Sequence, residues 1–221
     1  MRKSSIAVSV LLVAAVALAA PGTASAMEEI KLHFGIGGSI PIGNLGDVVD
    51  YGWRLNGGAA FFPSKKPIGF RVDVALDNWN LSDDFLEQLD TDTTLAGIQP
   101  PARGEARSFE ATFDVIWEPE TSGFWGSYLT GGVGAYHLTA SVSEDGIIYA
   151  YYCDPWYCYA TAFPRQYRVG DKSAWEWGLN AGAGITYQLL NGAQFYVEAT
   201  YQWIDTEQSV TWVPLQFGWR W

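Results

Sequence analysis

The sequence predicts an all-β protein whose eight antiparallel strands run up and down and close into a transmembrane β-barrel. Three observations support this fold class. Apolar and polar residues alternate along runs of about ten residues, the length of a tilted strand that crosses a bilayer. Aromatic residues gather near the ends of these runs. The connections between the runs are short and long in turn, as in barrels that span a membrane.

The composition agrees with this fold class. The chain has 221 residues, of which 48% are hydrophobic and 17% charged, and it contains 24 Gly and 11 Trp. It is too apolar for a disordered protein and has a single long apolar run, at 6–20. The formal net charge is −11, which argues against nucleic acid as a partner.

The long apolar run has the form of a secretory signal. Arg2 and Lys3 precede it, and the small residues Ala24, Ser25 and Ala26 follow it. This order predicts a Sec-type signal peptide over 1–26 that is removed, leaving a barrel domain over 27–221. An N-terminal membrane anchor is the alternative. After 20 the chain has no second apolar span, so the exported protein is either soluble or a barrel.

The first four strands follow from the alternation. In 30–40 and 68–77 the even positions are apolar, and in 53–61 and 108–117 the odd positions are. Because successive side chains of a strand point to opposite faces, each range has one apolar and one polar face. Prolines bracket a tight turn at 63–67.

The last four strands are predicted at 128–136, 175–188, 194–203 and 213–221, all with apolar odd positions. Asn191-Gly192 is a strong hairpin signal between the sixth and seventh strands. Pro214 lies inside the last strand, where it removes a ladder hydrogen bond, and we expect a local bulge there.

The remaining connections are predicted as loops. Those at 41–52, 78–105 and 143–170 are the longer ones, and those near 119–123 and 205–209 are brief. Within the second long loop, 84–87 could begin one helical turn. An even number of strands places both termini on the same side, which in such barrels is the periplasmic side.

The apolar face is predicted to meet lipid. A soluble lipocalin-like barrel would alternate in the same way with its apolar face inward, but an eight-stranded barrel has little room inside for large rings. Aromatic residues near both ends of the strands instead predict interfacial girdles. The girdle residues are Trp53, Phe61, Trp117, Trp175, Trp177, Trp203, Trp219 and Trp221.

The polar face is predicted to line the lumen. It combines glycines with charges of both signs, which suits a narrow lumen closed by ion pairs and hydrogen bonds. His33 is expected to belong to the same polar interior. The predicted lumen network is Arg54, Arg71, Asp73, Asp77, Glu110, Asp114, Glu176, Glu198 and Arg220.

Four segments resemble the outer-membrane β-barrel domain family, the group that includes the OmpA transmembrane domain and OmpX. They are YLTGGVGAY at 128–136, GLNAGAG at 178–184, FYVEATY at 195–201 and VPLQFGWRW at 213–221. Together they extend the resemblance over nearly the whole chain after 27, and Pro214 fits the last segment. The usual final residue of the family is Phe, so Trp221 departs from the pattern.

The resemblance implies a location and partners. It implies the outer membrane of a Gram-negative type bacterium, with outer-membrane lipid and lipopolysaccharide around the barrel. It also implies recognition of the C-terminal strand by the barrel-assembly machinery. The peptidoglycan-binding domain of OmpA is not expected, because the sequence ends at the barrel.

Two features of the third long loop stand out. Cys153 and Cys158 flank a Pro turn in an exported segment, which favours a disulfide over a metal or redox pair. Aromatic residues are frequent in the same loop. Exposed aromatic residues can mark a contact surface, but the alternative is that these residues simply pack on one another. The outer-loop contact candidates are Tyr151, Tyr152, Trp156 and Tyr157.

No metal site or cofactor is predicted. An acidic group in the second long loop lacks the spacing of an EF-hand, so a solvated loop is favoured over a calcium site. Divalent ions that bridge lipopolysaccharide phosphates are a further idea for this group. Its residues are Asp83, Asp84, Glu87, Asp90 and Asp92.

A lipid A-modifying enzyme would need a Ser and a His with a carboxylate on the lipid face. His137 with Ser141 and Glu144 is the candidate, but such enzymes place the Ser two residues after the His, and an interfacial histidine is favoured. No catalytic residue is therefore assigned. We expect a structural or surface-interaction role in which the outer loops form the contact surface. The alternatives are a narrow pore for ions or small solutes, a lipid A-modifying enzyme and a soluble lipocalin-like binding barrel.

Overall fold

A computed structural model of the protein describes residues 29–63, 67–86, 102–120, 123–153, 158–190, 192–206 and 209–221. At 29, at 102 and within 144–171 only the backbone is described. The predicted signal peptide at 1–26 lies outside the described residues. No helix in the described part of the chain is long and apolar enough to span a membrane.

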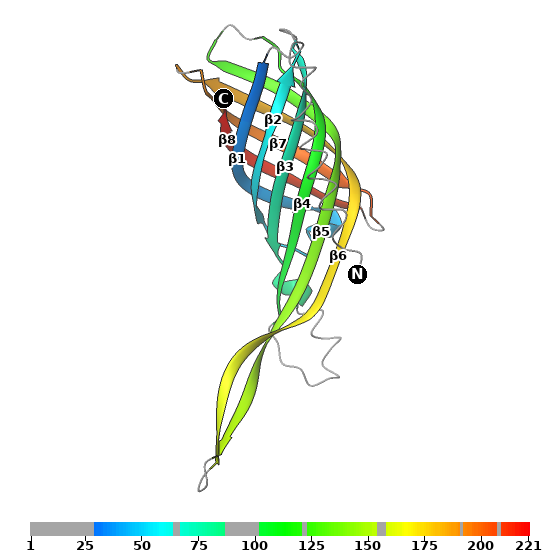
Figure 1. The fold of residues 1–221 in the computed structure, drawn as a ribbon. Helices are drawn as coiled ribbons and strands as arrows, with labels where there is room; N and C mark the ends of the chain where they lie inside the picture. Colours follow the sequence, from blue (N-terminus) through cyan, green and yellow to red (C-terminus); the bar gives the residue numbers. More distant parts are fainter. Residues whose placement is uncertain are drawn as a thin grey trace, which may run out of the picture.

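Eight antiparallel strands form one closed barrel in which each strand pairs with its neighbours in the chain and β8 pairs with β1 (Figure 1). The predicted fold class is confirmed. The strands are β1 (Glu29–Ile42), β2 (Gly52–Phe62), β3 (Ile68–Asn80), β4 (Ala102–Trp117), β5 (Trp125–Cys153), β6 (Cys158–Gln188), β7 (Gln194–Ile204) and β8 (Val210–Arg220).

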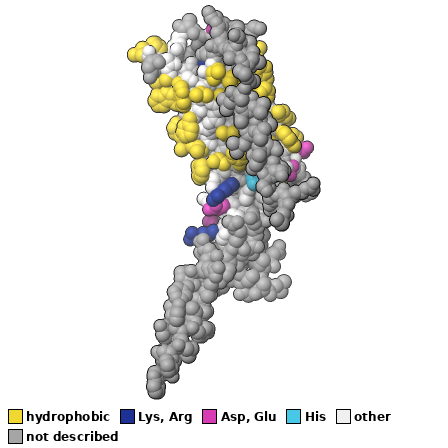
Figure 2. Space-filling model, in the orientation of Figure 1, with side chains coloured by type: hydrophobic (Ala, Val, Ile, Leu, Met, Phe, Trp, Pro, Cys, Tyr) yellow, Lys and Arg dark blue, Asp and Glu magenta, His cyan; other side chains and the backbone are white. Residues whose placement is uncertain are grey.

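The period-two pattern of the sequence becomes the two faces of the barrel wall. In β3, exposed and buried side chains alternate from Ile68 to Leu76, with Phe70 and Val72 outward and Arg71 and Asp73 inward. Figure 2 shows the result on the face in view, where hydrophobic side chains gather over the upper part of the barrel. An apolar outer wall with a polar interior is the arrangement of a barrel that spans a membrane.

The two ends of the barrel differ. The turn end carries the short connections β2–β3, β4–β5 and β6–β7 and the C-terminus, and it lies at the top of Figure 1. The loop end carries the connections β1–β2, β3–β4, β5–β6 and β7–β8. At the turn end Trp221 exchanges two backbone hydrogen bonds of 2.9 Å with Leu32, so the last residue also helps to close the barrel.

The β5–β6 hairpin corrects the predicted third loop at 143–170. The pairing of β4 with β5 stops at Ala102 and Glu144, whereas β5 pairs with β6 as far as Cys153 and Cys158. The hairpin therefore continues beyond the barrel as a two-stranded ribbon (Figure 1). We call residues 143–153 and 158–168 the ribbon. A two-stranded ribbon outside the wall has no lipid-facing side that requires alternation, so the sequence showed no period of two.

The second predicted loop is also shorter than expected. β3 continues to Asn80 and β4 begins at Ala102. Between them a helical turn occupies 83–86, close to the expected 84–87, although Glu87 lies outside the described residues. The Ser82 hydroxyl accepts a hydrogen bond of 3.3 Å from the Phe85 amide, which satisfies a free donor at the start of this turn.

Pro214 does not produce the expected bulge. Ala199 pairs with Leu215 and Gln202 with Trp212 in one continuous register, so β8 gains no extra residue at the proline. In the β1–β8 pairing Pro214 lies opposite Ser39. The register shift in the β5–β6 pairing lies instead at Val142/Ser143, where the ribbon leaves the barrel.

Candidate functional site

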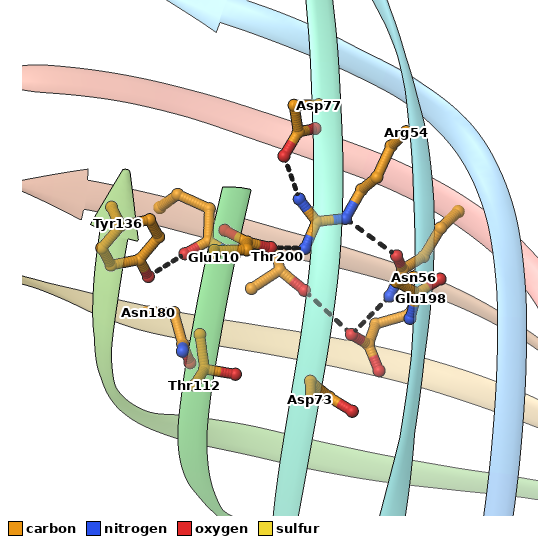
Figure 3. A network of polar contacts seen from close by, with 12 residues as sticks. Arg54, Asn56, Asp73, Asp77, Glu110, Thr112, Tyr136, Asn180, Glu198 and Thr200 are labelled. Carbon is orange, nitrogen blue, oxygen red and sulfur yellow. Dashed lines mark hydrogen bonds and ion pairs between the residues drawn. The ribbon is translucent and has the colours of Figure 1, made fainter. Parts of the chain in front are cut away.

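The lumen holds a network centred on two buried arginines, of which Figure 3 labels Arg54 with several of the surrounding polar side chains. Arg71 on β3 is the first. Its Nη1 and Nη2 atoms lie 2.6 and 3.1 Å from the two carboxylate oxygens of Glu198 on β7. Its Nε lies 2.7 Å from Asp73, and its Nη2 lies 3.4 Å from Asp114. One guanidinium therefore ties three carboxylates together across the barrel, in the two-pronged geometry that suits arginine.

Arg54 on β2 is the second centre. Its Nη1 lies 2.5 Å from Asp77, its Nη2 donates to Glu110, and its Nε donates to Gln216 at 3.2 Å. The Gln216 amide in turn donates to Glu198 at 2.9 Å. The two arginine clusters are thus joined into one hydrogen-bonded network, which we call the central network.

Further polar side chains satisfy the carboxylates of the central network. Glu198 also accepts hydrogen bonds from the Tyr128 hydroxyl at 2.5 Å and the Thr200 hydroxyl at 3.0 Å. Asp114 accepts a hydrogen bond of 2.8 Å from the Asn180 amide. Buried charges are tolerated when they are paired and hydrogen-bonded in this way.

A second polar layer closes the lumen at the turn end. Arg220 and Lys31 bind the two carboxylate oxygens of Glu118 at 3.0 and 2.9 Å. The Arg220 guanidinium also lies over the rings of Tyr128 and Tyr196, at 4.6 and 5.6 Å from their centroids. Such cation–π contacts fix the side chain across the lumen.

The loop end of the lumen is filled by a cluster of apolar side chains, which we call the plug. Trp212 packs edge-on against Trp79 and Tyr136, with ring centroids 5.5 and 5.8 Å apart. The Tyr136 hydroxyl donates to Gln202 at 2.6 Å, which links the plug to the polar wall. The buried members of the plug are Val49, Trp79, Leu81, Tyr136, Ile204 and Trp212.

Glycines on the inner wall make room for these rings. A Cβ atom on Gly178 would lie 2.8 Å from the Tyr136 ring, and one on Gly134 would lie 2.9 Å from it. Real Cβ atoms do not approach other atoms this closely, so a larger residue at either position would displace the tyrosine. The Gly-rich polar face of the sequence is thus partly a consequence of the large rings in the lumen.

The structure places the predicted lumen residues on the inner wall. Glu176 differs from the others: it is half-buried and makes no ion pair with any described residue. His33 also lies inside, with its Nε2 2.6 Å from Asp73. The fully or nearly buried members are Arg54, Arg71, Asp73, Asp77, Glu110, Asp114, Glu198 and Arg220.

The plug was not predicted from the sequence, and of the layer at the turn end only Arg220 was predicted as a member of the lumen network. Trp79 and Trp212 lie inside, although large rings were expected to lie outside. The signal was present, because Trp79 continues the inward odd positions of β3 and Trp212 the inward even positions of β8. Lys31 and Glu118 lie at the ends of β1 and β4, where alternation is least informative.

The predicted girdle residues lie on the outer surface, at both ends of the apolar band. Trp53, Trp175, Trp177 and Trp203 are near the loop end. Phe61, Trp117, Trp219 and Trp221 are near the turn end. Further rings at the turn end are Phe124, Trp125, Tyr187 and Phe195, of which Phe195 lies 4.0 Å from Trp219 between ring centroids.

The enzyme candidate is not assembled. His137 and Ser141 lie on the same face of β5 four residues apart, which is about 13 Å along a strand. That separation exceeds a hydrogen bond, so the serine cannot be activated by this histidine. The His137 ring instead lies 4.9 Å from the Trp175 ring on the outer surface.

The other predicted sites fall partly outside the described residues. The backbone register places Cys153 opposite Cys158, but their side chains, like those of Tyr151 and Tyr152, are not described. Trp156 and Tyr157, and the acidic residues Glu87, Asp90 and Asp92, lie outside the described ranges. Within those ranges no group of three or more His, Cys, Asp or Glu could hold a metal ion.

Comparison with known proteins agrees with this architecture. Residues 9–220 match the family described as outer membrane protein beta-barrel domain. Neisserial surface protein A is 14% identical, with a TM-score of 0.52 over 86% of this chain and 95% of its own. A major outer membrane protein from Thermus thermophilus is 13% identical, with a TM-score of 0.54 over 88% of this chain and 99% of its own.

Among curated proteins, none matches this chain. At these identities the solved structures show the fold, while the family match extends over nearly the whole sequence. The closed barrel, its apolar outer wall and its charged lumen agree with that match. The chain belongs to the outer membrane protein β-barrel domain family and is a protein of the cell outer membrane.

Proposed function

We propose that this protein is a non-conducting outer-membrane barrel whose ribbon serves as a contact surface outside the cell. In barrels of this kind the short turns face the periplasm and the longer loops face the exterior. On that orientation the loop end faces the exterior, and the ribbon projects from it.

The ribbon is the observation on which this proposal depends. It continues for ten residues beyond Ser143, which corresponds to about 33 Å of strand. Among the described residues, β4 and β7 pair with no part of it beyond Glu144, so within that part of the chain its two backbone edges are unpaired and suited to accept a further strand. Its sequence is rich in tyrosine, which is common at protein contact surfaces.

The lumen disfavours a pore as the main role. The layer at the turn end, the central network and the plug lie one behind another across the interior. An eight-stranded barrel is just wide enough for side chains to fill, and here they fill it. An ion would have to break buried ion pairs in order to pass.

Removal of the ribbon tests the contact role. In the variant, residues 144–170 are replaced by a short Asn-Gly turn, which keeps all eight strands within the barrel. Cells that produce the full chain should adhere more strongly than cells with the variant to at least one member of a panel of immobilised extracellular proteins and glycans.

Two controls accompany this adhesion experiment. The variant must still migrate differently in SDS before and after heating, which shows that the closed barrel has formed. Its amount in the outer membrane must equal that of the full chain. Equal adhesion of the two strains to every member of the panel would contradict the proposed contact role.

A further inference from the structure

The two edges of the ribbon differ in how well they can accept another strand. The arm of β5 at 143–153 contains no proline and no basic residue, and its stretch 146–152 is uncharged and consists largely of isoleucine and tyrosine. Among the described residues no other strand pairs with either arm beyond Glu144, and Figure 1 shows the ribbon standing clear of the barrel. The arm of β6 at 158–168 carries Pro164, Arg165 and Arg168.

The β6 edge has the features that protect an exposed strand from unwanted pairing. Pro164 has no N–H, and a proline inside a strand lies where its nitrogen faces away from the paired neighbour, so the outer edge of β6 lacks a donor. The charges of Arg165 and Arg168 on the same arm also discourage pairing. The β5 edge has none of these features, and a long uncharged edge of high β propensity pairs readily with a further strand. The β5 edge is therefore the one available for contact.

The direction of β5 restricts which copy of this chain can add to that edge. β5 runs from the turn end to the tip of the ribbon, so in every copy in one membrane it runs outward. Two β5 edges in the same membrane would therefore be parallel, whereas two β5 edges on facing membranes are antiparallel, which is the more stable pairing. Contact of a β5 edge with the β6 edge of a neighbour is disfavoured by Pro164.

We propose that the β5 edge of the ribbon pairs with the β5 edge of a second copy of this chain on a facing cell. The proposal rests on the contact role of the ribbon proposed above and names its partner. The uncharged stretch 146–152 is centred on Tyr149, so a two-fold axis at Tyr149 places each residue opposite one from the same stretch. Ile147 is then opposite Tyr151, a combination of β-branched and aromatic residues that stabilises antiparallel pairs.

The charges of the ribbon agree with this register. Glu144 and Asp145 precede the uncharged stretch, so in the antiparallel pairing they lie opposite the tip of the other ribbon and not opposite each other. In a parallel pairing in register each carboxylate would lie opposite its own counterpart, which is destabilising. The four arms form one sheet in the order β6, β5, β5, β6, and Pro164 protects both of its outer edges. The assembly therefore stops at two copies.

Aggregation of lipid vesicles that carry the purified full-length protein tests the proposal. The protein is reconstituted in phosphatidylcholine vesicles of two dye colours, so that no other protein can join them. Wild-type vesicles should aggregate, as measured by light scattering. Vesicles with Tyr149→Asp alone or Tyr149→Lys alone should aggregate about tenfold less, because like charges then face each other at the two-fold axis. A mixture of these two variants should aggregate again, with both dyes in each cluster, because opposite charges then face each other.

Ala162→Asp is the matched control. Ala162 is directly opposite Tyr149 within the ribbon, on the protected β6 arm, and vesicles with this variant should aggregate like the wild type. The heat-dependent shift in SDS confirms that each variant folds. Wild-type vesicles that stay dispersed would overturn the self-pairing, as would a dispersed mixture of the Asp and Lys variants at position 149. Equal loss of aggregation with Ala162→Asp would overturn the assignment to the β5 edge. None of these results bears on the adhesion of the ribbon-deletion variant, which tests the proposed contact role separately.

Discussion

At the scale of single residues, the lumen is stabilised by buried charged side chains, each of which is paired with a specific side chain of opposite charge. Arg71 is only 4% exposed and contacts Asp73, Asp114 and Glu198 at the same time. Removing the arginine leaves the three carboxylates charged and buried without their common cation. The loss of folding free energy on replacing Arg71 should therefore exceed the contribution of any one of its ion pairs.

Arg71→Met should lower the free energy of unfolding by about 3–5 kcal/mol, because three carboxylates lose their common cation. Urea unfolding in lipid vesicles, followed by tryptophan fluorescence, measures this difference. Arg107→Gln is the control, since its arginine is exposed, and it should change stability by less than about 0.5 kcal/mol. A midpoint for Arg71→Met equal to that of the wild type would contradict the role given to the central network.

The sequence allowed only part of this network to be predicted. Alternation assigned the arginines and carboxylates to one face. Arg54 and Asp77, and Arg71 and Asp114, are direct cross-strand neighbours, so a correct strand register would also predict their contacts. The contact between Arg71 and Glu198 joins β3 to β7 across the lumen. It depends on how the strands tilt when the barrel closes, which no local pattern encodes.

At the scale of elements, strands in the membrane were predictable and the ribbon was not. Lipid on one side and a polar lumen on the other require a period of two, which the sequence follows in every strand of the wall. The ribbon has neither constraint, and neighbouring residues such as Ile147 and Ile148 are both apolar. Its strands are specified by the mutual pairing of β5 and β6.

The end of the ribbon provides a test at this scale. The register places Cys153 opposite Cys158, and the compartment expected for this segment is oxidising. We predict a disulfide that closes the turn at 154–157. The unfolded protein should take up no maleimide before reduction and two after it, as measured by intact mass. Uptake of two maleimides without reductant would show that the cysteines are free.

At the scale of the whole molecule, the barrel combines an apolar outer wall with an interior that is closed in three different ways. Ion pairs with cation–π contacts close the turn end, the central network closes the middle, and aromatic rings fill the loop end. The charged lumen could be predicted from the sequence because, within each strand, the inward-facing side chains occupy every second position. The sequence did not predict the plug, because large rings such as Trp79 and Trp212 were expected on the outer surface. In addition, Val49 and Leu81 reach the mouth of the barrel from outside the regular strands.

The measurement that tests the closed lumen most directly is the conductance of the purified protein in planar lipid bilayers. Buried ion pairs and packed rings cross the lumen at three levels. The wild type should therefore give no stepwise current at about 100 mV in about 1 M KCl, conditions in which an open porin conducts. A general porin, inserted in the same bilayers, is the positive control. Reproducible single-channel steps from the wild type would show that the lumen opens, and the protein would then have to be regarded as a pore.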